Sequence, residues 1–372
     1  MINSKPRVAV VGGGVLGAST AQQLARGGAD VVLVTEGELT NNASGRSLSW
    51  LNSAGVRSES YHRLRMAGID RYRTVAAHHP VHDWLRFDGG LAWAPSDQAD
   101  EVRTRHGHEV AHGYESHLLG PDGVAAQVPG VDPGAIPEAG AVWNPGEGWV
   151  DLPSLVQFLV KDFAGQGGRL VTKAGRCQVE VRGGAVSAVH AAGGERFPVD
   201  AVVLATGPAV PAMAADLGIT IPDSTPISVL VTTKPLSHEL TAVLNTPRVS
   251  LRPTPGGALA VDADWPSDSI TRSTDGGYGV PEAVLEALLA EASRVLIGHP
   301  RLEADWSGIG PKPIPGDGNP VLGRVDDVAG LSLAFTHSGA TLGLIAGELL
   351  AYEIVEGRGH PLLADFNVRR FG

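Results

Sequence analysis

A glycine-rich turn near the start of the chain has the spacing that binds the phosphates of a dinucleotide. Glycine occupies positions Gly12, Gly14 and Gly17, between an apolar run at Val8–Val11 and a segment of helical periodicity at residues 16–25. Gly12 permits a tight turn, Gly14 lets a pyrophosphate approach the backbone, and Gly17 lets the helix pack closely on the sheet. The start of that helix presents free N–H groups and the positive end of its dipole to the phosphates.

An acidic residue, Glu36, follows a second apolar run at Val31–Val34. A carboxylate at this place accepts hydrogen bonds from the ribose hydroxyls of adenosine and repels a 2′-phosphate. A glycine cluster alone is equally typical of an ordinary turn. Here the strand, the glycines, the helix, the second strand and the acid follow in the order that a dinucleotide site requires. The sequence therefore predicts dinucleotide binding and disfavours NADP.

The elements that must position this site are spread over the whole chain. Apolar runs typical of parallel strands lie at the start, at 201–205 and at 331–335, and short strands such as 90–94 fill the gaps between them. A helix is predicted from Asp151, its N-cap, to about Phe163. The pattern predicts an α/β fold, α+β overall, in which a Rossmann-like FAD-binding domain is interleaved with a mainly antiparallel-sheet substrate domain. The predicted FAD-binding segments are 1–82, 149–214 and 301–372, and the substrate-binding segments are 83–148 and 215–300.

Composition excludes several classes of partner. The chain has 372 residues, a formal net charge of −11 and no basic run, so we predict no nucleic-acid binding. The one cysteine, Cys177, cannot form an internal disulfide or a Cys-rich metal site, and no metal site is predicted. The N-terminus has no signal-peptide apolar region and no run is long enough to span a membrane. We predict a cytoplasmic protein.

Beyond the glycine turn, four further blocks of sequence extend the pattern over nearly the whole chain: Asn42–Trp50, Trp143–Asp151, Val202–Gly207 and Phe335–Thr341. With these blocks the chain resembles the flavoprotein group of glycine oxidase, D-amino acid oxidase and sarcosine oxidase, the DAO family. The resemblance implies that FAD is the dinucleotide. Some relatives attach FAD through Cys or His, but no cysteine lies near Gly310–Pro311, so the FAD is predicted to be non-covalent.

The resemblance also implies which residues contact FAD. The block at residues 42–50 wraps the pyrophosphate and the flavin ring, the backbone of Cys177 meets the adenine, and the helix after Phe335 begins under the flavin pyrimidine. Backbone N–H groups there stabilise negative charge near the flavin N1 and O2 atoms. The predicted FAD contacts are Gly12, Gly14, Val15, Leu16, Gly17, Glu36, Ser44, Ser47, Leu48, Cys177, Thr206, Gly207, His337, Ser338, Gly339, Ala340 and Thr341.

In this family the flavin carries the chemistry. A hydride leaves the carbon that bears nitrogen and reaches flavin N5, which gives an imine and needs no general base. The resemblance therefore predicts a small amine or amino acid as the substrate. Amino-acid oxidases of the group grip the substrate carboxylate with a forked Arg, and Gly310 stands where that Arg is expected.

Four residues are candidates for contact with the substrate: Arg46, Arg252 and Lys312 could replace that Arg, and Trp50 could form a wall of the pocket. For Lys312 and Arg252 the alternative is a solvated surface charge, and for Trp50 it is packing.

Three alternatives stay open beside the oxidase. The first is a dehydrogenase of the same fold that uses an acceptor other than oxygen: sarcosine oxidases place a Lys over the flavin, and the matching stretch Gly257–Asp262 has none. A non-redox protein that keeps FAD as a structural element is the second alternative. A tRNA-modifying relative is the third, and the acidic charge argues against it.

Overall fold

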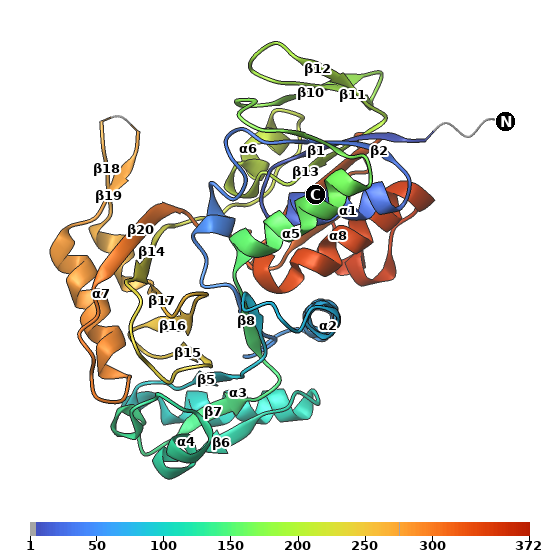
Figure 1. Ribbon diagram of the computed structural model, residues 1–372. Helices are drawn as coiled ribbons and strands as arrows, with labels where there is room; N and C mark the ends of the chain where they lie inside the picture. The colour runs from blue at the N-terminus through green and yellow to red at the C-terminus, as the bar shows by residue number, and fades with distance from the viewer. Residues whose placement is uncertain (1–4, 275) are drawn as a thin grey trace. The chain divides into compact units, whose positions relative to one another are not determined.

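The computed structural model describes residues 5–274 and 276–372, and its contacts divide the chain into two compact units (Figure 1). The first unit comprises Met1–Gly45, Leu152–Pro226 and Pro311–Gly372. The second unit comprises Arg46–Asp151 and Ile227–Gly310. Each unit therefore draws on segments that are far apart in the sequence.

A six-stranded sheet forms the centre of the first unit, in the order β21-β22-β13-β1-β2-β9. All neighbouring pairs are parallel except β21 with β22. These strands are rich in valine and leucine because parallel strands are buried on both faces. Their bounds are β1 Arg7–Val11, β2 Asp30–Val34, β9 Arg169–Val171, β13 Ala201–Leu204, β21 Val321–Arg324 and β22 Leu331–Phe335.

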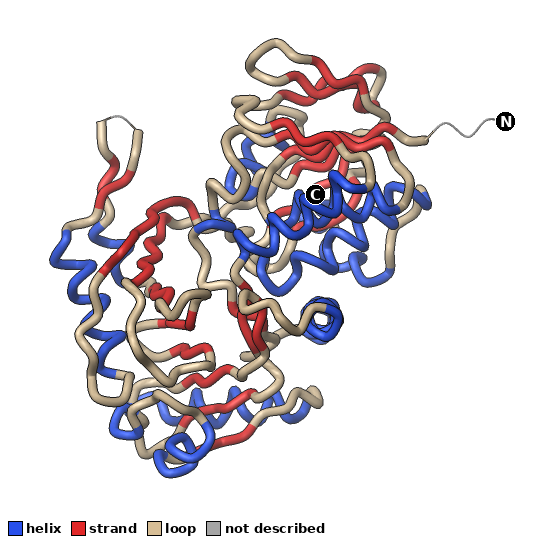
Figure 2. Tube along the Cα trace, viewed as in Figure 1, coloured by secondary structure: helices blue, strands red, loops and turns tan. Residues whose placement is uncertain are grey.

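Helices and a small antiparallel sheet cover the two faces of this central sheet (Figures 1 and 2). Helix α1 packs against α5 and α8, and Ser19 of α1 donates a hydrogen bond from Oγ to the carbonyl oxygen of Leu344 in α8, at 3.3 Å. On the other face, the sheet β10-β11-β12 buries Val189 and Phe197 against the core. The bounds are α1 Val15–Arg26, α5 Leu152–Gly165, α6 Val210–Ala215, α8 Gly339–Glu356, β10 Gln178–Arg182, β11 Ala185–His190 and β12 Arg196–Pro198.

The second unit is built on an eight-stranded sheet in the order β20-β14-β17-β16-β15-β5-β7-β6. The pairs β14-β17, β17-β16, β16-β15, β5-β7 and β7-β6 are antiparallel, and β15 runs parallel to β5. The strands are β5 Gly90–Ala92, β6 His117–Leu119, β7 Ala141–Asn144, β14 Ile227–Thr233, β15 Val243–Asn245, β16 Ser250–Pro253, β17 Leu259–Asp262 and β20 Ala304–Pro311. A mainly parallel sheet in one unit and a mainly antiparallel sheet in the other confirm the predicted fold class.

Shorter elements complete the second unit. In a three-stranded sheet, β3-β8-β4, both β3 and β4 pair with β8, which follows much later in the chain. Helix α7 buries Leu288, Leu289 and Ala292 in the core of this unit. The bounds are β3 Trp50–Leu51, β4 Leu85–Arg86, β8 Gly148–Val150, β18 Thr271–Arg272, β19 Tyr278–Gly279, α2 Glu59–His78, α3 Ala99–Ala111, α4 Pro121–Gln127 and α7 Glu282–Arg294.

The boundaries of the two units differ from the predicted domain boundaries. Residues 46–82, 149–151 and 301–310 cluster with the second unit, because β3 and β4 pair with β8 and because β20 joins the eight-stranded sheet. Residues 215–226 cluster with the first unit, where Lys312 N–H donates to the Pro226 carbonyl oxygen at 2.9 Å. That FAD belongs to the first unit and substrate to the second stays a prediction.

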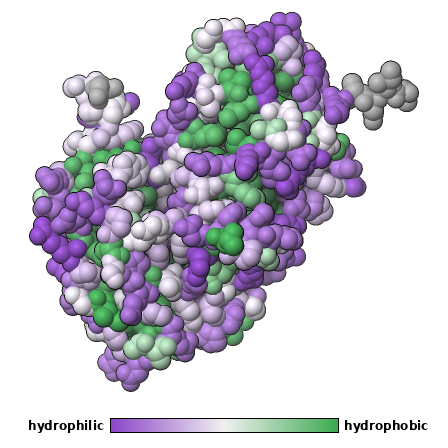
Figure 3. Space-filling model, viewed as in Figure 1, coloured by the Kyte–Doolittle hydropathy of each residue, from purple (hydrophilic) through white to green (hydrophobic). Residues whose placement is uncertain are grey.

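Among the described residues, no helix has the length and apolar character that crossing a membrane requires. Polar side chains predominate on the face of the molecule seen in Figure 3. A few large apolar side chains are exposed, among them Val56 at 67% and Trp306 at 46%.

Candidate active site

The glycine turn of the first unit is fixed by close approaches of backbone to backbone. Gly12 has a φ of 124°, and a Cβ built on it would lie 2.9 Å from the Thr206 nitrogen. A Cβ on Gly17 would overlap the carbonyl oxygen of Gly12. Both positions therefore exclude any side chain, as the sequence pattern predicts.

The N-terminus of α1 suits an anion. Its N-cap, Gly14, has no side chain to cap the helix, and the first turn contains no acidic residue. The Val15 N–H donates to Ser44 Oγ at 3.0 Å, and a Cβ on Gly14 would meet only the Ser44 side chain, at 2.9 Å from Oγ. The remaining N–H groups of the first turn and the helix dipole are therefore available to a phosphate.

Most of the other predicted cofactor contacts follow the carboxyl ends of neighbouring parallel strands. Glu36 follows β2, Thr206 and Gly207 follow β13, and residues 337–341 follow β22. Since β2, β1, β13 and β22 are adjacent and parallel, these segments lie at one edge of the sheet. Ligands of open α/β sheets bind at this edge.

A second helix begins at the same edge. Helix α8 starts after its N-cap Ser338, which makes no side-chain cap, and its first turn holds no acidic residue. A Cβ on Gly339 would lie 3.9 Å from Val15 Cγ1, so the starts of α1 and α8 are neighbours. Ser338 and Thr341 are buried, whereas His337 is exposed. Two helix N-termini therefore converge where a cofactor with negative charge would bind.

Cys177 lies beside the carboxyl end of β2. Gly175 N–H donates to the Glu36 carbonyl oxygen at 3.1 Å, and Cys177 Sγ lies 3.7 Å from the Gly175 carbonyl oxygen. Burial and the charge of Glu36 raise the pKa of the Cys177 thiol to about 11. The group therefore stays a thiol at neutral pH, consistent with a small buried side chain rather than a nucleophile. The described residues include no group of His, Cys, Asp or Glu side chains arranged to hold a metal ion.

In the second unit, the side chain of Arg46 packs on two glycines of β20. A Cβ built on Gly310 would lie 2.7 Å from Arg46 Cζ and 2.9 Å from Nε, with Nη2 closer still. A Cβ on Gly308 would lie 2.7 Å from the Cγ and Cδ atoms of Arg46. The guanidinium of Arg46 thus occupies the space in which a side chain at position 310 would begin.

Ser47 and Leu48, two of the predicted cofactor contacts, belong to the second unit and are held by local and distant partners. Ser47 Oγ accepts a hydrogen bond from Ser49 N–H at 3.0 Å. The Leu48 carbonyl oxygen accepts from Arg252 Nε. This anchor fixes the backbone that follows Arg46.

Arg252 is buried, with 3% of its side chain exposed, so the alternative of a solvated surface charge is wrong. Its Nη1 donates to the Pro253 carbonyl oxygen at 2.7 Å, and its guanidinium lies 5.1 Å from the Trp149 ring centre and 3.9 Å from Asp151. Burial lowers the pKa of Arg252 to about 10. The geometry favours a role in holding the segment around Leu48 over direct substrate contact.

Trp50 is held by a residue that the sequence analysis did not single out, Glu147. Trp50 Nε1 donates to Glu147 Oε2 at 2.7 Å, and the Tyr114 hydroxyl donates to Glu147 Oε1 at 2.6 Å. Burial raises the pKa of the Glu147 carboxyl to about 8, so the group is mainly neutral at pH 7. The available signal was the place of Glu147 between Gly146 and Gly148, beside the apolar residues Trp149 and Val150, where charge is rare.

Lys312, the fourth substrate candidate, is half-buried and belongs to the first unit. The other three candidates, Arg46, Trp50 and Arg252, belong to the second unit, where Arg252 anchors the segment between Arg46 and Trp50.

Taken together, the parallel sheet and the glycine turn between β1 and α1 in the first unit define a protein of the Rossmann class. The family model for FAD dependent oxidoreductases, DAO, matches residues 7–353. The chain belongs to this family, and FAD is its cofactor. The backbone approaches at Gly12 and Gly17 and the start of α1, whose N-cap is a glycine, fit the pyrophosphate of that cofactor.

Relatives and solved structures agree with the family assignment. Glycine oxidase of Geobacillus kaustophilus (strain HTA426) is 26% identical over 383 residues, which cover 98% of this chain and 96% of the relative. The crystal structure of glycine oxidase from Geobacillus kaustophilus superposes with a TM-score of 0.80 at 23% identity, covering 98% and 99% of the two chains. L-Amino acid deaminase from Proteus myxofaciens gives a TM-score of 0.83 at 17% identity, covering 100% and 94%. L-Proline dehydrogenase from P. horikoshii gives 0.79 at 18% identity, covering 99% and 98%.

Proposed function

We propose that this enzyme oxidises the carbon–nitrogen bond of a small amine or amino acid. FAD, when bound, accepts at N5 the hydride that leaves the carbon bearing nitrogen, and the product is an imine. The observation that carries the proposal is the meeting of the glycine turn, Glu36, Thr206 and the start of α8 at one sheet edge, in a chain of the FAD dependent oxidoreductase family. The relatives named glycine oxidase and L-amino acid deaminase support this class of substrate.

Within this proposal, the protein's own residues bind and orient. The starts of α1 and α8, whose first turns contain no acidic residue, hold the anionic cofactor through backbone N–H groups and the helix dipoles. Arg46 is the residue we assign to the substrate carboxylate, since its guanidinium fills the space beside Gly310 and Arg252 is committed to backbone carbonyls. Burial lowers the pKa of Arg46, but a guanidinium keeps its charge at neutral pH.

An anaerobic titration tests the reaction class. The holoenzyme is mixed with D- and L-amino acids, N-methyl amino acids, glycine and simple amines in turn, and the visible flavin band is recorded. Bleaching by one of these compounds is the expected result. A flavin that dithionite bleaches but none of these compounds does would contradict the proposal and favour a structural role for FAD.

Admission of air to the bleached enzyme separates two forms of the activity. Recovery of the band within seconds identifies an oxidase. A band that stays bleached identifies a dehydrogenase with another acceptor, which the absence of a Lys from Gly257–Asp262 favours.

The role of Arg46 is tested by removing its guanidinium and then placing a guanidinium at position 310 instead. Arg46→Ala should weaken binding of a carboxylate-bearing substrate by about 10- to 100-fold, since a charge-assisted hydrogen bond contributes about 1.5–3 kcal/mol. The double variant Arg46→Ala with Gly310→Arg should recover part of the loss, because the new side chain enters the vacated space. An amine without a carboxylate serves as the control and should be bound equally by all three proteins. An equal loss for that amine would contradict the assignment.

A further inference from the structure

One tryptophan of the second unit has a large exposed surface. The chain contains seven tryptophans, all within the described residues, and Trp306 on β20 is the only one of them that is exposed, at 46%. A single exposed apolar side chain is common on protein surfaces, so its surroundings decide whether it has a role.

Trp306, Gly308 and Gly310 lie on one face of β20, because successive side chains of a strand point to opposite sides. Ile309, on the other face, packs against the hydrophobic core of the second unit. Gly308 and Gly310 are buried nonetheless. The face that carries Trp306 is therefore covered by side chains other than those of this core.

The indole of Trp306 lies beside the side chain of Arg46. A Cβ built on Gly308 would overlap Trp306 Cη2, and the same Cβ would lie 2.7 Å from the Cγ and Cδ atoms of Arg46. The two side chains approach one point over Gly308 and are therefore neighbours. The guanidinium lies further along the strand, where a Cβ on Gly310 would lie 2.7 Å from Cζ. An aromatic ring and a positive charge thus follow each other along one strand face.

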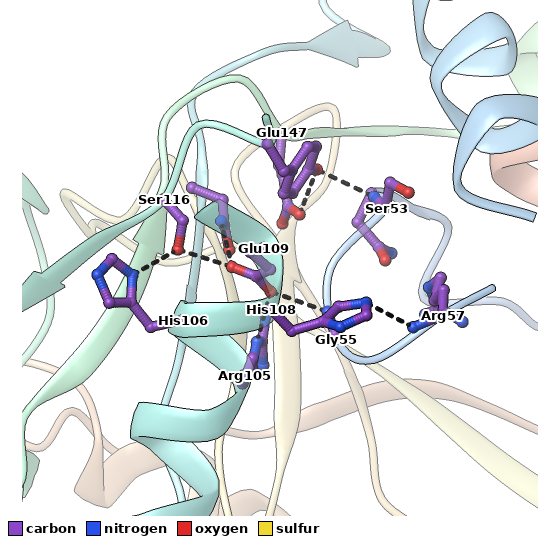
Figure 4. A network of polar contacts seen from close by, with 12 residues as sticks. Ser53, Gly55, Arg57, Arg105, His106, His108, Glu109, Ser116 and Glu147 are labelled. Carbon is purple, nitrogen blue, oxygen red and sulfur yellow. Dashed lines mark hydrogen bonds and ion pairs between the residues drawn. The ribbon is translucent and has the colours of Figure 1, made fainter. Parts of the chain in front are cut away.

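Trp50, which follows Arg46 by four residues, is held in a different way. Its Nε1 donates to Glu147 Oε2 at 2.7 Å, and Glu147 lies in the network of polar contacts shown in Figure 4. The indole of Trp50 is therefore tied to the interior of the second unit. Trp306 keeps apolar surface that a ligand can remove from water, which favours binding.

The spacing of the ring and the charge selects the length of a ligand that can use both. Two residues of a strand span about 7 Å, which separates the place over Gly310 from the place over Gly308. A carboxylate bound to the Arg46 guanidinium starts over Gly310. Glycine and alanine end short of the indole, whereas an amino acid with a ring or a branched chain beyond its Cβ reaches it.

We propose that Trp306 determines the substrate specificity of this enzyme, because its indole receives the aromatic or large aliphatic side chain of an amino acid whose carboxylate binds Arg46. This inference rests on the proposed oxidation and on the assignment of Arg46. It narrows the substrate class to large apolar amino acids and disfavours glycine. The discrimination comes from apolar surface that only the larger side chain covers.

Calorimetry on the holoenzyme tests the proposal with two acids that contain no nitrogen, 3-phenylpropanoate and propanoate. They share the carboxylate and differ by the ring. Wild type should bind 3-phenylpropanoate about 10-fold or more tighter than propanoate, since the ring buries apolar surface on Trp306. Trp306→Ala should remove most of this preference and leave the affinity for propanoate within about threefold of wild type.

Four further variants make the comparison specific. Trp306→Phe keeps an aromatic ring and should keep most of the preference, whereas Trp306→Gln keeps bulk without the ring and should lose it, so the test does not depend on the folding of Trp306→Ala. Asp305→Ala is the matched control, because Asp305 is exposed and its side chain lies on the other face of β20. It should change neither affinity. Arg46→Ala should weaken both acids, because it removes the charge that they share.

A preference for 3-phenylpropanoate that is the same in wild type, Trp306→Ala and Trp306→Gln would overturn the proposal. Binding of neither acid to wild type, or binding of both acids to Arg46→Ala as tight as to wild type, would also overturn it. Flavin reduction is not read in this experiment, so failure of the proposed oxidation is seen separately, in the titration with amines and amino acids. Where that titration finds turnover, kcat/KM for phenylalanine relative to alanine should fall in Trp306→Ala by the same factor as the binding preference.

Discussion

Two segments of this enzyme contain glycines for different structural reasons. In the first unit, Gly12 and Gly17 are glycine because backbone atoms of the same turn and of Ala205–Thr206 occupy the space of their side chains. In the second unit, Gly308 and Gly310 are glycine where the side chain of Arg46 lies. The first segment makes a surface of backbone donors, and the second makes room for a charge delivered from a distant part of the sequence.

The glycine turn at residues 12–17, the first region, and the segment Arg46–Trp50, the second region, are held in place in different ways. The glycine turn is positioned by a strand and a helix that directly adjoin it. The segment Arg46–Trp50 is held by Arg252 at Leu48 and by Glu147 at Trp50, two partners that are far away in the chain. Only a substitution that alters the backbone should therefore disrupt the first region. Loss of one distant side chain should be enough to disrupt the second region.

The largest effect is expected from Gly17→Val. A side chain at this position meets the Gly12 carbonyl oxygen, and the backbone there cannot move aside as a flexible side chain could. We expect FAD affinity to fall by about 100-fold or more, about 3 kcal/mol, measured by fluorescence on flavin release. Gly107→Ala in α3, where a Cβ would meet nothing within 4 Å, is the control and should leave FAD affinity unchanged. Wild-type affinity in Gly17→Val would contradict the account of the turn.

Arg252→Ala should break the second region. It removes the donors to the Leu48 and Pro253 carbonyls and the contact with Trp149, and we expect the free energy of unfolding to fall by about 2–5 kcal/mol. Arg248→Ala is the comparison, because Arg248 is 55% exposed and its ion pair with Glu291 is long, at 3.6 Å. That variant should lose about 1 kcal/mol or less in urea unfolding. An equal fall in the free energy of unfolding in the two variants would show that the buried contacts of Arg252 do not stabilise the fold more than an exposed ion pair does.

Glu147→Gln should change how stability depends on pH. The carboxyl titrates near pH 4.3 in the unfolded chain and at about 8 in the folded one, so the folded state binds one more proton between these values. The free energy of unfolding should therefore fall by up to about 1.4 kcal/mol per pH unit as the pH rises through this window.

The glutamine variant has no proton to lose at this position, so its stability should lack this slope. Urea unfolding between pH 5 and pH 8.5 measures the difference. The same slope in both proteins would contradict a neutral Glu147 at pH 7.

The smallest effect is expected from Cys177→Ser. The predicted contact of Cys177 with adenine is made by backbone, and its buried thiol is protonated at neutral pH. FAD affinity should therefore stay within about threefold of wild type, less than about 0.7 kcal/mol. A larger loss would show that the side chain takes part in the first region.

Sequence alone identified the first region because its signals are local. The signals follow one another in the sequence: the strand β1, the glycines, the helix α1 and then Glu36. The antiparallel sheet of the second unit was also predicted, from short strand-like segments in the chain. The domain boundaries were less accessible, since β3 joins the second unit through pairing with β8, about a hundred residues later.

The second region depended on contacts that no local pattern contains. The sequence named Arg46 and noted that Gly310 departs from the family, but nothing in it indicated that the two positions meet. Likewise, a solvated surface charge was one interpretation of Arg252 from the sequence. Its side chain is buried because β16, which contains it, lies between β15 and β17 in the sheet. Side-chain partners that lie this far apart are fixed by the fold and not by the neighbouring residues.

The central claim, that the enzyme oxidises a carbon–nitrogen bond with its FAD, is tested most directly by a single anaerobic turnover with the best substrate of the titration. Oxidation followed by hydrolysis of the imine should release one carbonyl product and one equivalent of ammonia or amine per flavin bleached. Bleaching with both products in this ratio is the result the account predicts. With an acyclic substrate, bleaching with no nitrogen released and no carbonyl formed would contradict it, because an acyclic imine hydrolyses and the hydride would then have come from a bond other than the one beside nitrogen.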